Sequence, residues 1–171
     1  CELTLNEDSY IEVVRNKTAV LLSAASRCGA VLGGVTDDQE EALADFGMLV
    51  GIAFQFMDDA LDYVADQADF GKARGHDLLE GKVTLPLIHT LSRCTSEERK
   101  QIEAIVEQDE LPQSDLAVVI ELIERYDGIG YTRQRAGEFV AKAKQRLSLF
   151  ADCEVRQGMF DVADYVIARN K

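Results

Sequence analysis

A chain of 171 residues is long enough to bury a hydrophobic core in one domain and too short to require two. Its 31 acidic and 18 basic side chains give a net charge of −13, which argues against a nucleic-acid surface and against a polybasic membrane patch. A polyanionic partner would therefore need metal ions to bridge it to the chain.

The hydrophobic residues recur with a period near 3.6 along almost the whole sequence, so we expect helices throughout. The first helix is predicted over residues 8–34, with a break near Asn16 left open and a pair of glycines at its C-terminus. A second long helix is predicted from Thr36 or Asp37 to about Asp66, with acidic residues in its first turn, where the helix dipole favours them.

Glycine and charged residues dominate the segment 67–83, which is predicted to be a loop. Thr84 and Pro86 indicate the cap and first turn of the helix LPLIHTLSR. Further helices are predicted over TSEERKQIEAIVEQ, QSDLAVVIELIERYDG, YTRQRAGEFVAKAKQRLSLFAD and RQGMFDVADYVIAR. The short connections between them favour a single all-α domain built as a helical bundle with antiparallel neighbours.

The cysteines are widely scattered, at Cys1, Cys28, Cys94 and Cys153. They signal neither a zinc site nor a disulfide framework, so free thiols in a reducing cytoplasm are expected, with Cys28 and Cys94 buried. His89 is expected to pack, since no second imidazole or thiol is placed to share a metal with it. The longest apolar stretch, AVLLSAASRCGAVLGGV, contains Arg27 and two serines and falls short of a transmembrane segment.

Three aspartates lie close together near the end of the second long helix. Asp58 and Asp62 are four residues apart, so their carboxylates can converge on one hard cation, and Asp59 lies beside them. Gly47 and Gly51 share the helix face of Asp58 and Asp62, and their lack of side chains is expected to leave room for something bulky to pass. A solvated acidic face is the simpler interpretation, but the shared glycines and the lysines that follow favour a functional one.

Several cations and polar groups accompany the aspartates. Lys72 and Lys82 each lie next to a glycine in the predicted loop, and two solvated lysines would explain them equally well. Lys17 and Thr18 interrupt an apolar helix, where a polar pair needs solvent or a partner. Gln55 is explained equally well as a residue of the same site or as a buried amide that hydrogen-bonds to the backbone. Because Mg²⁺ takes carboxylate, water and phosphate oxygens, the DDxxD pattern predicts a diphosphate held through Mg²⁺.

The segment GIAFQFMDDALDY is preceded by NKTAVLLSAASRCGAVLGG and followed by FGK and GHDLLEGKVTLPLI. These motifs, in this order, closely resemble the trans-prenyl diphosphate synthases, specifically the polyprenyl type such as octaprenyl diphosphate synthase. The resemblance covers essentially the whole chain. It implies an all-α bundle of the isoprenoid synthase type, acting as a homodimer, that condenses an allylic prenyl diphosphate with isopentenyl diphosphate to make a trans-polyprenyl diphosphate.

By this resemblance, the metal-binding residues are the aspartates of DDALD. Asp58 would bind Mg²⁺ directly, and Asp59 and Asp62 would support the metal and its waters. Asp77 and Lys82 belong to the matching closing loop, and Lys82 is counted among the diphosphate-binding residues.

The resemblance also assigns the remaining site residues. Lys17 and Lys72 would contact the allylic diphosphate, while Thr18 and Gln55 would line the reacting carbon and steady its positive charge. The implied mechanism is ionisation of the allylic diphosphate, attack by the isopentenyl double bond and loss of a proton.

Two departures from the family pattern bear on this transfer. His76 stands where the family usually has another polar or cationic residue, and Leu79 stands where an arginine is common. The first aspartate-rich motif and the basic residues that bind isopentenyl diphosphate are absent from these 171 residues. The chain begins CELTLNED, so we expect a C-terminal portion of a longer synthase that is inactive alone. Alternatives are a non-catalytic regulatory or binding subunit of a heteromeric synthase and, less favoured by GKVTLPLI and NKTA, a terpene cyclase.

Overall fold

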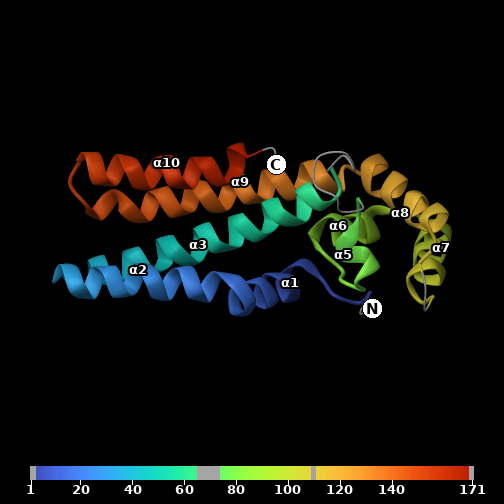
Figure 1. Cartoon of the computed structure of the whole chain (residues 1–171), viewed down its shortest axis with the longest axis horizontal. Coiled ribbons are helices and arrows are strands. Elements are labelled where there is room, and N and C mark those ends of the chain that lie inside the picture. The colour runs from blue at the N-terminus through green and yellow to red at the C-terminus, as the bar shows by residue number, and fades with distance from the viewer. Residues whose placement is uncertain (1–2, 65–73, 109–110, 170–171) are drawn as a thin grey trace. The chain divides into compact units, whose positions relative to one another are not determined.

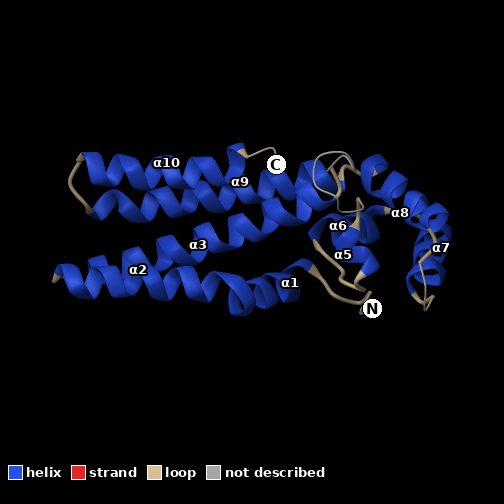
Figure 2. Ribbon diagram, viewed as in Figure 1, coloured by secondary structure: helices blue, strands red, loops and turns tan. Residues whose placement is uncertain are grey.

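The computed structural model describes residues 3–64, 74–108 and 111–169 (Figure 1). Every regular element within these ranges is helical (Figure 2), so the all-α class expected from the sequence is confirmed. The helices form two compact units, the first mainly of residues 3–10 and 58–133 and the second mainly of 11–57 and 134–169. The single domain expected from chain length stays a prediction.

Three helices have residues in both units: α1 (Glu7–Val14), α3 (Asp37–Asp62) and α9 (Gly128–Arg146). In the second unit, α1 continues into a π-helical turn, Arg15–Ala19, and then into α2, Val20–Gly33. The helix predicted over 8–34 therefore exists, and its irregularity near Asn16 is a widened turn within a continuous helical path. It ends at Gly34, whose φ of 63° is one that side-chain-bearing residues rarely adopt.

The helix α3 begins after Thr36, which exchanges hydrogen bonds with Gln39: each side-chain oxygen accepts from the other residue's N–H. Two of its glycines lie against the earlier helical path, Gly47 against α2 and Gly51 against the last residue of the π-helical turn. A Cβ on Gly47 would lie 2.4 Å from the carbonyl oxygen of Leu22, and one on Gly51 would lie 2.6 Å from the Cα of Ala19. The space that these glycines leave is therefore filled by the backbone of the neighbouring helix.

The rest of the second unit is formed by the later helices, with α9 and α10 (Glu154–Ala168) side by side in Figure 1 and a 3₁₀ turn, Leu147–Leu149, between them in sequence. Phe56 of α3 meets Phe139 of α9 edge to face, with ring centroids 5.6 Å apart. Arg169 places its guanidinium 4.2 Å from the centroid of the Phe54 ring. Aromatic and cation–π contacts thus join the last helices to α3 within this unit.

Within the described residues, four helices lie wholly in the first unit: α5 (His76–Leu79), α6 (Leu85–Arg93), α7 (Ser96–Val106) and α8 (Gln113–Arg125). The last three confirm helices predicted from the sequence. Thr84 stands at the N-cap of α6 and Pro86 in its first turn, as expected, but the Thr84 side chain makes no capping hydrogen bond. Thr95 and Glu98 form a capping box at the start of α7.

The Glu98 carboxylate is held by several donors. The Tyr126 hydroxyl donates to it over 2.5 Å, the Thr95 N–H over 2.9 Å, and Arg125 pairs with it at 2.8 Å. The Tyr126 hydrogen bond is the largest cause that lowers the pKa of Glu98 to about 2, followed by the Thr95 N–H. The folded-state pKa of Glu98 lies below the unfolded value of about 4.5, so the ionised carboxylate stabilises the folded chain. This contribution to stability is present above pH 4.5 and is lost as the pH falls toward 2.

We therefore expect Glu98→Gln to lower the melting temperature at pH 7, and the difference from the unmodified chain to shrink between pH 5 and pH 2. Thermal unfolding followed by circular dichroism at a series of pH values measures this difference. Glu97→Gln removes a neighbouring exposed charge and is the matched control. A difference for Glu98→Gln that stays constant over this pH range would contradict the assignment.

The cysteine expectation was half wrong. Cys94 is half-buried, but Cys28 is exposed on α2. On the same helix, the exposed fractions of Leu21 and Leu32 are 72% and 89%, so this side of α2 is apolar and open to solvent among the described residues. No helix in the described ranges combines the length and apolar character that crossing a membrane requires.

Candidate active site

The three aspartates at the end of α3 lie in different environments. The side chains of Asp58 and Asp62 are partly exposed, whereas Asp59 is fully buried. At about 100° per residue, Asp58 and Asp62 lie about 40° apart around the helix, and Asp59 lies on the far side of Asp62. The expected pairing of Asp58 with Asp62 on one face is therefore present, and Asp59 points into the first unit.

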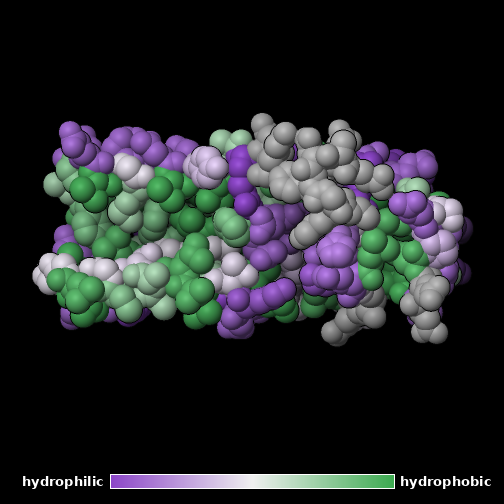
Figure 3. All heavy atoms as spheres, in the orientation of Figure 1, coloured by the Kyte–Doolittle hydropathy of each residue, from purple (hydrophilic) through white to green (hydrophobic). Residues whose placement is uncertain are grey.

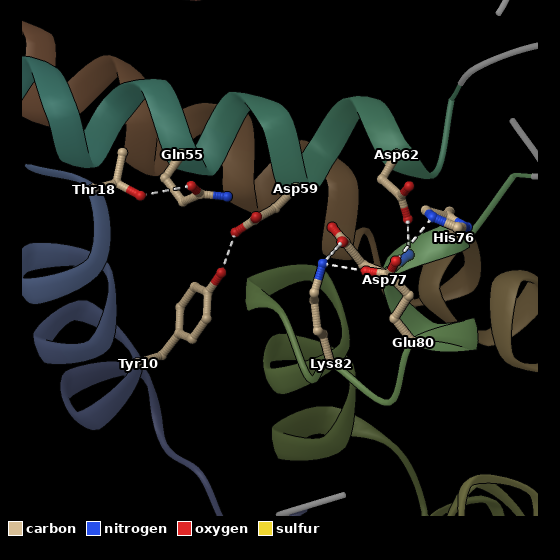
Figure 4. A network of polar contacts seen from close by, with 9 residues as sticks. All are labelled: Tyr10, Thr18, Gln55, Asp59, Asp62, His76, Asp77, Glu80 and Lys82. Carbon is tan, nitrogen blue, oxygen red and sulfur yellow. Dashed lines mark hydrogen bonds and ion pairs between the residues drawn. The ribbon is translucent and has the colours of Figure 1, made fainter.

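Tyr10 supplies a partner for the buried aspartate. Its hydroxyl donates a hydrogen bond of 2.5 Å to Oδ2 of Asp59 (Figure 4), and the Tyr10 side chain is itself buried. Burial raises the pKa of Tyr10 far above its usual value, and the nearby Asp59 charge raises it further. The phenol thus stays protonated and donates at neutral pH. Nothing in the sequence indicates this pair, because Tyr10 is one apolar-face residue of α1, 49 positions from Asp59.

Asp62 meets the beginning of α5. Its Oδ2 accepts the Asp77 N–H at 3.1 Å, and its own carbonyl accepts the Gly75 N–H at 3.0 Å. Gly75 adopts a φ of 75°, so the chain turns sharply here before α5 begins. Burial raises the pKa of Asp62, and the Asp77 N–H partly offsets this effect. The return of the chain therefore fixes the Asp62 carboxylate.

Lys82 is held by carboxylates of its own segment. Its Nζ lies 2.9 Å from Oδ1 of Asp77 and 2.5 Å from Oε2 of Glu80 (Figure 4). The hydrogen bond with Glu80 is the largest cause that raises the pKa of Lys82 above its usual value. Glu80 also lies 3.2 Å from Nε2 of His76, an ion pair only when the imidazole is protonated. The predicted contact of Lys82 with a diphosphate stays a prediction, and it requires Lys82 to leave these partners.

In the second unit, the Thr18 hydroxyl donates a hydrogen bond of 3.0 Å to Oε1 of Gln55 (Figure 4). Thr18 and the exposed Lys17 both belong to the π-helical turn. Such turns cost regular helical hydrogen bonding and are frequent at functional sites. The sequence singled out Lys17 and Thr18 for their polarity in an apolar helix and Gln55 for its place on the helix face of the aspartates, and the structure pairs Thr18 with Gln55. Lys72 lies outside the described residues.

His89 packs as expected. Its ring stacks on Tyr131 with centroids 3.9 Å apart and an interplanar angle of 17°, and burial lowers the pKa of the imidazole. Across the described ranges, no three His, Cys, Asp or Glu side chains are grouped so as to hold a metal ion. Asp58 and Asp62 offer two hard carboxylate donors, which fits Mg²⁺, an ion usually held by one or two carboxylates plus waters and substrate phosphates.

Comparison with known proteins places these residues in context. Residues 1–123 match the family model described as polyprenyl synthetase. The octaprenyl diphosphate synthase of Escherichia coli is 37% identical over 98% of this chain and 51% of its own length. The short chain isoprenyl diphosphate synthase of Methanothermobacter thermautotrophicus is 35% identical over the same shares.

Solved structures of prenyl synthases are also similar to this chain. The polyprenyl synthase from Caulobacter crescentus, in complex with calcium and isoprenyl diphosphate, has a TM-score of 0.92 at 36% identity and covers 99% of this chain and 52% of its own. The decaprenyl diphosphate synthase from Rhodobacter capsulatus has a TM-score of 0.90, also at 36% identity, with the same coverage of both chains. The chain thus spans about half the length of the relatives that it matches.

Proposed function

Because this chain belongs to the polyprenyl synthetase family, we propose that it forms the diphosphate-ionising part of a trans-prenyltransferase. The reaction condenses an allylic prenyl diphosphate with isopentenyl diphosphate to give a longer trans-polyprenyl diphosphate. The observation that carries the proposal is the pair of partly exposed carboxylates, Asp58 and Asp62, on one face of α3. The Caulobacter structure, which is complexed with calcium and isoprenyl diphosphate, supports a cation-assisted site.

Mg²⁺ is the proposed cofactor, with Asp58 as a direct ligand and Asp62 supporting it. When bound, this ion would neutralise negative charge on the departing diphosphate. The carboxylates of Asp58 and Asp62 supply hard oxygen donors, and the Asp77 N–H holds Asp62 in place for this task. A bound cation would also offset the repulsion that is general for two like charges four residues apart on a helix.

The chain's polar residues would guide the substrate through ionisation. The bond between the allylic carbon and the diphosphate oxygen breaks, its electron pair leaves with the diphosphate, the isopentenyl double bond attacks the allylic carbon and a proton is lost. Lys17, Lys72 and Lys82 are proposed to bind the diphosphate. The Thr18 hydroxyl and the Gln55 amide, already hydrogen-bonded, would turn their dipoles toward the developing positive charge.

Calorimetric titration of inorganic pyrophosphate into the chain, with and without Mg²⁺, tests this proposal. We expect binding only when Mg²⁺ is present, because net charge −13 disfavours a free polyanion. Equal binding without Mg²⁺ would contradict the cation-assisted site. Absence of binding under both conditions would show that this chain does not hold the site by itself, which is the outcome expected of a half-site that needs its missing partner motif or of a non-catalytic subunit.

A homodimer is also proposed. Large apolar side chains are exposed in the second unit, among them Leu21 and Leu32 of α2 and Val155 of α10, which is 73% exposed. Figure 3 shows hydrophobic residues gathered on the viewed face over the helices of this unit. Contiguous exposed apolar surface favours association with a partner. Sedimentation velocity should show a dimer, and a monomer over a wide concentration range would contradict it. The cytoplasm is the proposed compartment, given the free thiols of Cys28, Cys94 and Cys153.

A further inference from the structure

We infer that Asp59 does not bind the cation, and that Tyr10 is a positioning residue that holds Asp59 inside the first unit. The inference deepens the proposed function and rests on it, because it assigns different tasks to the aspartates of the proposed cation site. It departs from the expectation drawn from resemblance, in which Asp59 supports the metal.

The burial of Asp59 separates it from the other two aspartates. Asp59 is 0% exposed, whereas Asp58 and Asp62 are partly exposed. A buried carboxylate is stable only where hydrogen-bond donors replace the water that it has lost. The Tyr10 hydroxyl is such a donor at 2.5 Å, and its own 6% exposure shows that the whole pair is shielded from solvent. A cation that keeps its waters has no access to a carboxylate in this setting.

The hydrogen bond between Tyr10 and Asp59 also affects the orientation of α3. Tyr10 belongs to α1 and Asp59 to the last turns of α3, so their hydrogen bond joins two helices within the first unit. Holding Asp59 in this direction also helps to hold the rotation of the last turns of α3 about the helix axis. Asp62 lies about 60° and Asp58 about 100° from Asp59 around the helix, both on the same side. The pair therefore contributes to the direction in which the two proposed cation-binding carboxylates face.

Titration of the full chain with Mn²⁺, followed by the electron paramagnetic resonance signal of the free ion, tests the ligand assignment. Asp59→Asn keeps an oxygen that can accept from Tyr10, so we expect its Mn²⁺ affinity to stay within about threefold of the unmodified chain. Asp58→Asn removes a direct ligand and should weaken affinity by at least about tenfold. Equal losses in the two variants would overturn the inference while leaving the proposed function in place.

Tyr10→Phe tests the positioning role. It leaves the buried Asp59 carboxylate without this donor, so we expect a lower urea midpoint and Mn²⁺ affinity about threefold to tenfold weaker under conditions where the variant is folded. Tyr10→Phe combined with Asp59→Leu replaces both polar partners with apolar ones and should recover both quantities in part. A merely structural tyrosine would lower the midpoint alone, and that result would overturn the positioning role.

Failure of the proposed function has a different signature. If the unmodified chain binds no Mn²⁺ at all, the proposed cation site is wrong, and the inference is overturned with it. If the unmodified chain binds Mn²⁺ and only the Asp59 or Tyr10 variants depart from expectation, the inference alone is wrong.

Discussion

Gly47→Ala is expected to lower the free energy of unfolding by about 2 kcal/mol, within the range of about 1–3 kcal/mol for overpacked sites. The new Cβ would lie 2.4 Å from the Leu22 carbonyl oxygen and 2.5 Å from Oγ of Ser26. The serine can rotate away, but the carbonyl belongs to the backbone of α2 and moves only if the helices separate. Alanine returns at most about 1 kcal/mol through its helix propensity, so the steric effect wins.

Gly29→Ala is the matched control. Gly29 also lies inside a helix of the second unit, yet a Cβ there meets nothing within 4 Å. Only the propensity term acts, so this variant should be more stable by about 0.5–1 kcal/mol. Urea unfolding followed by circular dichroism measures both changes. The opposite signs are the result to look for, and stabilisation by Gly47→Ala would show that α2 and α3 are not in backbone contact.

Asp58→Ala is expected to weaken Mg²⁺-dependent binding of pyrophosphate by about 100-fold, or about 2.8 kcal/mol at 1.4 kcal/mol per tenfold. The reason is that Mg²⁺ takes only one or two carboxylates from a protein, so losing a direct ligand removes a large part of its hold. Calorimetry on the variant with Mg²⁺ at the concentration used for the unmodified chain measures the loss.

Asp38→Ala controls for net charge. Asp38 lies in the first turn of the same helix, and its removal changes the charge of the chain by the same amount. We expect pyrophosphate binding to be unchanged in this variant, apart from a small loss of helix stability through the dipole. A similar loss in both variants would mean that overall charge, and not Asp58 as a ligand, controls the binding.

Much of the helical structure was predictable because local rules decide it. The periodicity of α7, α8 and α10 follows from one buried face each, and the start of α3 follows from Thr36 and the acidic residues after it. The end of α3 was less predictable: the helix stops at Asp62, four residues before the expected Asp66. There the Gly75 N–H bonds back to the Asp62 carbonyl, a contact that no local pattern contains.

The candidate site was likewise predictable from the sequence only in part. The spacing of Asp58 and Asp62 placed both on one face, because a helix repeats every 3.6 residues. The same spacing could not show that Asp59 is buried against Tyr10 or that Lys82 is held by Asp77 and Glu80. Nor could it show that two glycines of α3 face the backbone of α2 and of the π-helical turn before it. Each of these contacts depends on which part of the folded chain lies against the residue, and spacing along one helix does not contain that information.

The sequence by itself determined the helical class, most helix positions, the aspartate-rich segment and the family, since all of these depend on residue types at short and regular spacing. Only the tertiary structure decided which polar groups have partners. Thr18 meets Gln55 across 37 residues and Tyr10 meets Asp59 across 49, so each pair forms only when packing brings separate helices together. Burial makes the Tyr10–Asp59 pair the more demanding of the two, because a polar group removed from water needs a hydrogen-bond partner.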